Sequence, residues 1–308
     1  MFTLDLYKLE IFARVAEAGS LSHAAEQLRM TQSGVSQHIK ALEDSLGTAL
    51  FERGRRGVRL TEAGRRLLGY SEAIFRLVAE AELAVTDVAG LREGRLAIGA
   101  TPGVSAYLLP DWVQAFGQRY PNLTVTTQTT ITPAIIRELR AGQLDLAVIE
   151  GELDDGATRD LRVQPLQEFD QFVVVGPKHP WRERDELALA ELAGQPLVTR
   201  QAGSQTRLWL DQALRDYGVT MRVVAELDNL ESIKRMVMLG ASLAILPLYT
   251  VRAEQELGLL RAIPLAGRPL RRTLRLLWRA GRPLGPVGRT FAQFLAELFP
   301  AAAPLPPA

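Results

Sequence analysis

Residues 31–47 read TQSGVSQHIKALEDSLG, and this stretch decides the fold of the N-terminal part of the chain. Its aliphatic residues recur at spacings of four, three and four, which predicts one buried helical face. Thr31 can cap the start of that helix, and Gly47 ends it. The opposite face carries side chains that can hydrogen-bond base edges and phosphates. With Thr31, these candidate DNA contacts are Gln32, Ser33, Ser36, Gln37 and Lys40.

Two shorter helices are expected upstream of this stretch. The first has an apolar stripe and ends at Gly19, and the second is capped by Ser20. A tight break at residues 29–30 separates the second helix from the third. The two stripes are Leu9, Phe12, Ala13 and Ala16 in the first helix, and Leu21, Ala24, Ala25 and Leu28 in the second.

A basic hairpin is expected directly downstream, where residues 50–60 read LFERGRRGVRL. Val58 and Leu60 alternate with Arg59, which places Arg59 outward, and the two glycines permit the turn. Three helices and a basic hairpin predict a winged helix-turn-helix over residues 1–60. The alternative is a small helical capping domain with a solvated arginine loop. The arginines expected on phosphates or in the adjacent minor groove are Arg53, Arg55, Arg56 and Arg59.

Six short stretches in this region resemble the LysR-type transcriptional regulators. They read AAEQL (24–28), TQSGVS (31–36), IKALE (39–43), LG (46–47), LFER (50–53) and LTEAG (60–64), and the match spans most of residues 4–66. The resemblance implies a sequence-specific regulator that binds double-stranded DNA. It also implies a homotetramer built as a dimer of dimers, and such a regulator can contact RNA polymerase.

A long linker helix is predicted over residues 61–91, capped by Thr61. Its inward positions have a mean spacing of 3.5 residues, which is typical of a coiled coil. A rod with one apolar seam needs a partner, so we expect a homodimer through residues 61–90 that reads a pseudo-palindromic promoter site. The alternative is a helix packed on its own C-terminal domain. The seam is Leu67, Ser71, Ile74, Val78, Ala81, Val85 and Val88.

The remainder of the chain, residues 92–308, has the alternating texture of an α/β domain. Strands are expected at 96–100, 123–130, 144–149, 172–176, 221–227, 243–246 and 274–278. The alternating α/β texture starts again near residues 163–168, and a closing helix is expected at 287–299. Two α/β halves between which the chain crosses twice are typical of a periplasmic-binding-protein-like fold. Subdomain I is expected to comprise residues 92–163 and 268–300, and subdomain II residues 164–267.

A ligand site is expected between the two halves, because open α/β sheets bind ligands at the carboxyl ends of their strands. Residues 203–207 read GSQTR, which places hydroxyl and guanidinium donors at a helix start and suits an anion. This stretch looks like one found in some LysR-type regulators, where it implies a small anionic effector facing Thr101. The plain alternative is that the serines and threonines among the candidates only cap helices. The candidates are Thr101, Gly103, Thr130, Thr132, Ser204, Gln205, Thr206, Arg207 and Asn229.

The composition excludes several functional classes and kinds of site. The 308 residues are 47% hydrophobic and 23% charged and contain no cysteine, which removes disulfides and Cys-ligated zinc. The three histidines are scattered, and the motifs GxSxG, GxxxxGK[ST] and GxGxxG are absent. Both observations argue against an enzyme, which is the rival functional class for this fold. Asp145, Glu150, Asp154 and Asp155 are expected to be solvated or paired with arginine. With no apolar run long enough to span a bilayer and no signal peptide, we expect a cytoplasmic protein without cofactor or metal.

Overall fold

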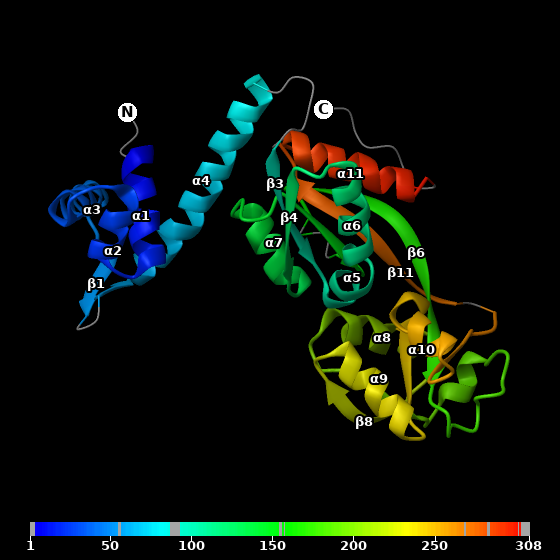
Figure 1. The fold of residues 1–308 in the computed structure, drawn as a ribbon. Helices are drawn as coiled ribbons and strands as arrows, with labels where there is room; N and C mark the ends of the chain where they lie inside the picture. The colour runs from blue at the N-terminus through cyan, green and yellow to red at the C-terminus, as the bar shows by residue number, and fades with distance from the viewer. Residues whose placement is uncertain are drawn as a thin grey trace. The chain divides into compact units, whose positions relative to one another are not determined.

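The structure is a computed structural model of the chain, and it describes residues 4–54, 57–86, 93–153, 156, 158–267, 269–281, 284–300 and 302. These residues fall into two compact units, one comprising residues 4–86 with 140–143 and the other the remaining residues of 93–302 (Figure 1). Among the described helices, none combines the length and the hydropathy that a membrane span requires.

The N-terminal unit is a winged helix-turn-helix followed by a long helix. Its elements are α1 (Leu6–Ala18), α2 (Leu21–Leu28), α3 (Gln32–Leu46), β1 (Phe51–Gly54), β2 (Gly57–Leu60) and α4 (Glu62–Thr86). Gly19 and Gly47 end α1 and α3 with φ angles of 62° and 67°, as predicted. The side chains of Ser20 and Thr31 accept hydrogen bonds from the first turns of α2 and α3, which confirms both caps.

The core of this unit corrects one predicted stripe. In α1 the buried residues are Leu9, Ile11, Phe12 and Val15, whereas Ala13 and Ala16 lie at the edge of that face. The larger aliphatic side chains therefore take the centre of the interface with α3, because they bury more apolar area than alanine. Around this core pack half-buried side chains from the hairpin and from α4: Val58, Leu60, Ala63, Leu67, Leu68, Ile74 and Phe75.

In the part of the C-terminal unit that the structure describes, nine strands form one sheet with the order β4-β3-β5-β11-β6-β9-β7-β8, and β10 pairs with β6. The strands are β3 (Gly94–Ala100), β4 (Leu123–Thr129), β5 (Leu146–Glu150), β6 (Leu161–Val175), β7 (Pro196–Arg200), β8 (Arg222–Leu227), β9 (Leu243–Pro247), β10 (Arg261–Ile263) and β11 (Leu270–Arg279). The helices are α5 (Pro102–Tyr107), α6 (Leu109–Arg119), α7 (Thr132–Arg140), α8 (Gln205–Asp216), α9 (Leu230–Leu239), α10 (Arg252–Glu256) and α11 (Pro286–Leu298), with short 3₁₀ segments η2 (Leu189–Leu192) and η3 (Leu248–Thr250).

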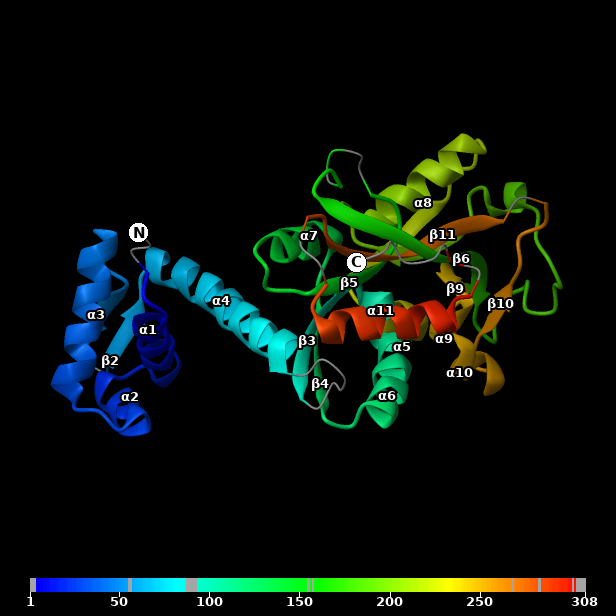
Figure 2. The same cartoon turned by 90° about the horizontal axis from the view of Figure 1, so that it is seen from above.

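Helices cover both faces of this sheet in two lobes. In the first lobe, which contains β3 to β5, helices α5, α6 and α11 pack on one face and α7 packs on the other. In the second lobe, which contains β7 to β10, α8 and α9 pack on opposite faces (Figure 2). This alternation follows from strands whose successive side chains point to opposite faces and are apolar on both, as in β5 and β9.

Strands β6 and β11 join the lobes and correct the predicted strand pattern. A strand was expected at 172–176, with only a restart of the α/β texture near 163–168, but β6 is continuous from Leu161 to Val175 because it pairs with β11 up to Gln171 and with β9 beyond it. A register shift lies between Leu274 and Arg275, opposite Gln167 and Pro165, where proline cannot donate a backbone hydrogen bond. Leu166 serves the core of the first lobe, and Val173 serves the core of the second. Strand β7 was missed, since its apolar run between Pro196 and Arg200 is short.

Candidate functional site

The exposed face of α3 is the first candidate surface. Val35, Ile39 and Leu42 are buried on one side of the helix, which fixes the opposite side toward solvent. The predicted DNA contacts divide by exposure: Thr31, Gln32, Ser33, Gln37 and Lys40 are exposed, and Ser36 is half-buried. This face therefore offers amide, hydroxyl and ammonium donors together, the groups that bind base edges and phosphates in a major groove.

The hairpin is held beside α3 by one carboxylate. Glu43 Oε1 accepts hydrogen bonds from the backbone N–H groups of Leu50 (2.7 Å) and Phe51 (3.2 Å). On the other strand, the backbone N–H of Val58 donates to Gly19 O at 3.0 Å. These bonds tie both strands to the helical core, so the hairpin is positioned independently of its arginines.

The described part of the hairpin carries one of the predicted arginine side chains. Strands β1 and β2 pair antiparallel, with Arg53 opposite Val58 and Glu52 opposite Arg59. Arg59 is exposed, and Val58 and Leu60 pack on the core, as predicted. Arg55 and Arg56 lie outside the described residues, and the structure describes only the backbone of Arg53.

The second candidate site is a cavity between the two lobes of the C-terminal unit. Its volume is about 70 Å³, and it lies at the carboxyl ends of β3, β5, β7 and β9. From the first lobe it is lined by Thr101, Pro102, Gly103, Ile131, Thr132 and Glu150, and from the crossing strands by Gln171 and Arg272. From the second lobe it is lined by Arg200, Ser204, Gln205, Thr206, Leu230, Ile245, Leu246, Pro247, Tyr249 and Thr250.

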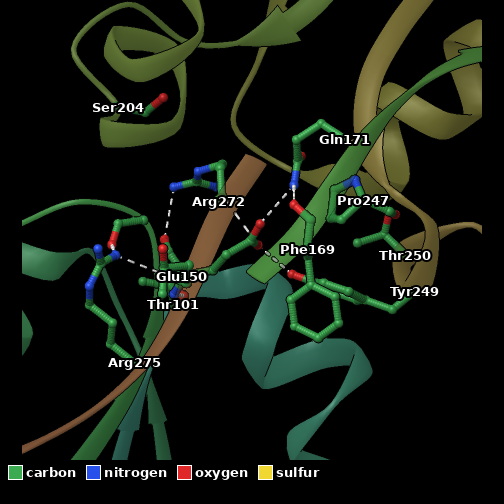
Figure 3. A network of polar contacts seen from close by, with 12 residues as sticks. Thr101, Glu150, Phe169, Gln171, Ser204, Pro247, Tyr249, Thr250, Arg272 and Arg275 are labelled. Atoms are coloured by element: carbon green, nitrogen blue, oxygen red, sulfur yellow. Dashed lines mark hydrogen bonds and ion pairs between the residues drawn. The ribbon is translucent and has the colours of Figure 1, made fainter. Parts of the chain in front are cut away.

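A buried network around Glu150 forms one wall of this cavity (Figure 3). Gln171 Nε2 donates to Glu150 Oε1 at 3.0 Å, and the Tyr249 hydroxyl donates to the other carboxylate oxygen. Arg272 Nη2 donates to the backbone carbonyl of Glu150 at 2.8 Å, and its guanidinium lies 3.7 Å from the carboxylate. Burial and the adjacent Glu150 charge raise the pKa of Tyr249 well above its ordinary value, so its hydroxyl keeps its proton and donates.

Two guanidinium N–H groups at the cavity are buried without a hydrogen-bond partner in the described part of the chain. They are the Nε groups of Arg200 and Arg272. Arg272 shares its charge with Glu150, and its guanidinium carbon lies 5.3 Å from the centre of the Trp209 ring. Burial lowers the pKa of Arg200, and the charge of Asp228 only partly opposes that effect. A buried N–H group without a hydrogen-bond partner is unfavourable, so an anion that accepts from these two groups would be bound favourably.

The cavity contains most of the predicted effector residues. Thr101, Gly103, Thr132, Ser204, Gln205 and Thr206 line it, whereas Thr130, Arg207 and Asn229 do not. Thr101 Oγ1 makes no capping bond and accepts from the backbone N–H of Glu150 at 3.2 Å. Thr132 is the first residue of α7 and is buried.

Three of the expected donors have other partners. Arg207 binds Asp211 through Nε at 2.8 Å and Glu226 through Nη1 at 3.0 Å, so its charge is already neutralised by carboxylates. Asn229 caps α9 by accepting from the backbone N–H of Glu231 at 2.8 Å. Ser204 caps α8 in the same way, at 3.2 Å from the N–H of Arg207, but it also lines the cavity.

The sequence did contain a signal for one missed residue. Leu270, Arg272, Leu274 and Leu276 alternate along β11, so Arg272 occupies an inward position in an otherwise apolar register. Arg200, Gln171 and Tyr249 lack such a signal, because they come from segments whose neighbours are set only by the tertiary fold. Glu150 pairs with an arginine, as expected for that acidic group.

Comparison with protein families covers nearly the whole chain. Residues 6–65 match the family described as "Bacterial regulatory helix-turn-helix protein, lysR family", and residues 89–300 match the "LysR substrate binding domain". A probable RuBisCO transcriptional regulator of Cyanophora paradoxa is 33% identical and covers 96% of this chain and 92% of its own. The HTH-type transcriptional activator CmpR of Synechocystis is 30% identical, with 96% of each chain covered.

Solved structures share the fold. Full-length OxyR from Pseudomonas aeruginosa superposes with a TM-score of 0.75 at 22% identity and covers 99% of both chains. CbnR in complex with its target DNA gives a TM-score of 0.70 at 20% identity and covers 96% of this chain and 99% of its own. The regulatory domain of Synechocystis CcmR in complex with 2-PG gives 0.61 at 24% identity and covers 67% of this chain and 98% of its own.

Proposed function

Because the chain belongs to the LysR family of bacterial transcriptional regulators, we propose that a small anion in the cavity between its lobes controls its action on DNA. The chain is a DNA-binding transcription regulator with an effector-binding domain. Its relatives are named as regulators, which argues against catalysis as its own activity.

The unpartnered N–H group of Arg200 carries the proposal of an anionic effector. Arg200 Nε and the hydroxyl of Ser204 lie at one cavity, together with the first residues of α8, whose N-terminus favours negative charge. A volume of about 70 Å³ has room for roughly five water molecules, which suits a small anion. CcmR, a structural relative, has been solved with 2-PG, and this makes 2-PG the first compound to test.

The exposed face of α3 supports the proposed DNA contacts. Gln37 and Lys40 lie on it beside Ser33, and the hairpin would bring Arg59 to the phosphate backbone. Arg53, Arg55 and Arg56 remain predicted phosphate contacts. We also propose that α4 pairs two chains on a pseudo-palindromic site and that two such dimers form a tetramer; contact with RNA polymerase remains a prediction.

A single titration tests the DNA and effector parts together. Full-length protein is titrated against labelled DNA from upstream of its own gene, with scrambled DNA of equal length as control, in the presence and absence of 2-PG, phosphate or sulfate. We expect the protein to bind the specific DNA more tightly than the scrambled DNA. We also expect an added anion to change which protein–DNA complexes form, because closure of the lobes shifts the population of assemblies. Equal affinity for both DNAs would contradict the proposal, and indifference to every anion would contradict its effector part.

The two kinds of DNA contact can be separated by substitution. Gln37→Ala should weaken binding to the specific DNA while leaving the scrambled DNA unaffected, because base contacts carry specificity. Lys40→Gln should reduce the dependence of affinity on salt by about one ion, because each phosphate contact releases roughly one counterion. If Gln37→Ala instead reduced the salt dependence and Lys40→Gln weakened binding only to the specific DNA, the proposed roles of these two residues would be exchanged.

A further inference from the structure

Two phenol–carboxylate hydrogen bonds join the lobes in opposite directions. Tyr249 of the second lobe donates to Glu150 of the first, at the wall of the cavity. Tyr107 of the first lobe, the last residue of α5, donates to Glu231 on α9 of the second lobe. Tyr107 and Glu231 do not line the cavity, so their bond joins the lobes without occupying the ligand's space.

A buried lysine completes the contact around Tyr107. Lys234 has a side chain that is only 3% exposed, and its Nζ lies 2.7 Å from both Glu231 Oε1 and Glu254 Oε1. The same Nζ donates to Thr250 O at 3.1 Å and lies 4.8 Å from the centre of the Tyr107 ring. The first lobe thus supplies a ring over a cation that belongs entirely to the second lobe.

We propose that Tyr107 and Glu231 form a latch between the lobes, so that the cavity retains its ligand with the help of a side-chain pair outside it. Separation of the lobes would break the Tyr107–Glu231 bond and remove the ring that covers Lys234. Tyr107 is then a positioning residue, since it acts on the ligand through the closed arrangement of the lobes. The ligand half of this inference rests on the proposed effector function.

Tyr107 is chemically suited to this role over the physiological range. Burial, followed by the hydrogen bond to Glu231, raises its pKa to about 12, so the hydroxyl stays a donor. The Glu231 side chain is 64% exposed, and water competes for it in the open form. The latch should therefore change affinity by about 5- to 20-fold, less than a fully buried ionic bond would.

The first test measures binding of 2-PG, phosphate and sulfate to the full-length protein. Tyr107→Phe keeps the ring and removes the hydroxyl, and we expect about 5- to 20-fold weaker binding through faster dissociation. Glu231→Ala should weaken binding at least as much, since it also removes the ion pair with Lys234. The double variant should bind no more weakly than Glu231→Ala alone, because that substitution already removes the Tyr107–Glu231 bond. Tyr120→Phe is the matched control, since Tyr120 lies in the first lobe against Phe116. Additive effects would overturn the latch.

The second test needs no ligand. The chain contains no cysteine, so exposed Gln118 and Thr220 can be replaced by cysteines for spin labels, one in each lobe. We expect Tyr107→Phe to lengthen and broaden the distance distribution, and Tyr120→Phe to leave it unchanged. An unchanged distribution in Tyr107→Phe would overturn the latch. If the wild-type protein binds none of the anions, the effector proposal fails, and this distance measurement alone decides the latch.

Discussion

Arg200 and Arg207 lie at either side of one turn of the second lobe, and the structure gives them different partners. Arg207 is bound by Asp211 and Glu226, whereas Arg200 Nε is buried at the cavity without a hydrogen-bond partner among the described residues. The charge that recognises the anion is therefore expected to come from Arg200. Arg207 instead supports the helix that presents Ser204.

Arg200→Gln should weaken anion binding by about 10- to 100-fold, because it removes a charged donor worth about 1.5–3 kcal/mol. Calorimetry with 2-PG measures the change, and Arg215→Gln, at an exposed position near the end of α8, is the matched control. Arg207→Gln should mainly lower the unfolding temperature. If Arg207→Gln abolishes binding in a folded protein while Arg200→Gln does not, the assignment is wrong.

Alkaline pH should destabilise the protein through its buried phenols. The pKa of Tyr107 is raised to about 12 by burial and its hydrogen bond to Glu231, and the pKa of Tyr249 is raised by burial beside Glu150. Between pH 10 and 12 the unfolded chain loses these protons while the folded chain keeps them, so the free energy of unfolding falls as pH rises. Urea unfolding measures this fall, which should be shallower in Tyr107→Phe than in the wild-type protein. An equally steep fall in Tyr107→Phe would exclude this phenol as a source.

At the residue scale, hydrogen bonds within a helix start could be predicted from the sequence, whereas contacts between distant segments could not. The caps Ser20 and Thr31 follow from the preference of short polar side chains for helix starts, and that preference needs no knowledge of the fold. The side chains that surround Glu150 come from β6, β11 and η3, which are far apart in the sequence. Their proximity depends on strand pairing, which residue spacing does not specify.

At the element scale, the winged helix-turn-helix and the α/β texture were predictable because each helix and strand carries its own period. The exceptions are elements whose limits depend on a neighbour. β6 continues through Pro165 because β11 pairs with it from Leu161 to Gln171, and β7 is short enough to escape a pattern search. Within α4, Leu67 and Ile74 were expected in the seam for a partner, but they pack on the core of their own unit.

Gly57 is the position where the hairpin depends most on having no side chain. Its φ is +131°, and a Cβ there would lie 2.3 Å from Gly19 O, whereas Gly47 has a φ of +67° and open space. Both alanine variants suffer from positive φ, so Gly57→Ala should destabilise the N-terminal unit by about 3 kcal/mol and Gly47→Ala by about 1 kcal/mol.

The four tryptophans, at positions 112, 181, 209 and 278, all lie in the C-terminal unit. A loss of far-ultraviolet circular dichroism without a tryptophan transition therefore reports unfolding of the N-terminal unit. Equal unfolding midpoints for the two glycine variants would mean that the hairpin can move away from Gly19.

At the scale of the whole molecule, α4 packs on the winged helix-turn-helix of its own chain and is also expected to pair with a second chain. One face packs on the winged helix-turn-helix through Leu67 and Ile74, which leaves Tyr70 and Leu77 exposed by 59% and 44%. These two residues are seven apart and lie on one side of the helix, as the contact residues of a coiled coil do. We therefore expect the surface that pairs two chains to be displaced from the predicted seam onto Tyr70 and Leu77.

Leu77→Glu should halve the molar mass in sedimentation equilibrium, because a buried unpaired carboxylate at the seam disfavours pairing. Leu298→Glu on α11 is the matched control, since Leu298 is also 44% exposed and should leave the mass unchanged. Specific DNA should then bind the Leu77→Glu protein as a single half-site interaction, with the loss of the affinity that two linked recognition helices provide. A wild-type mass for Leu77→Glu, or the same fall in mass for Leu298→Glu, would remove α4 from the pairing surface. The pseudo-palindromic arrangement would then have to arise from contacts within the C-terminal unit.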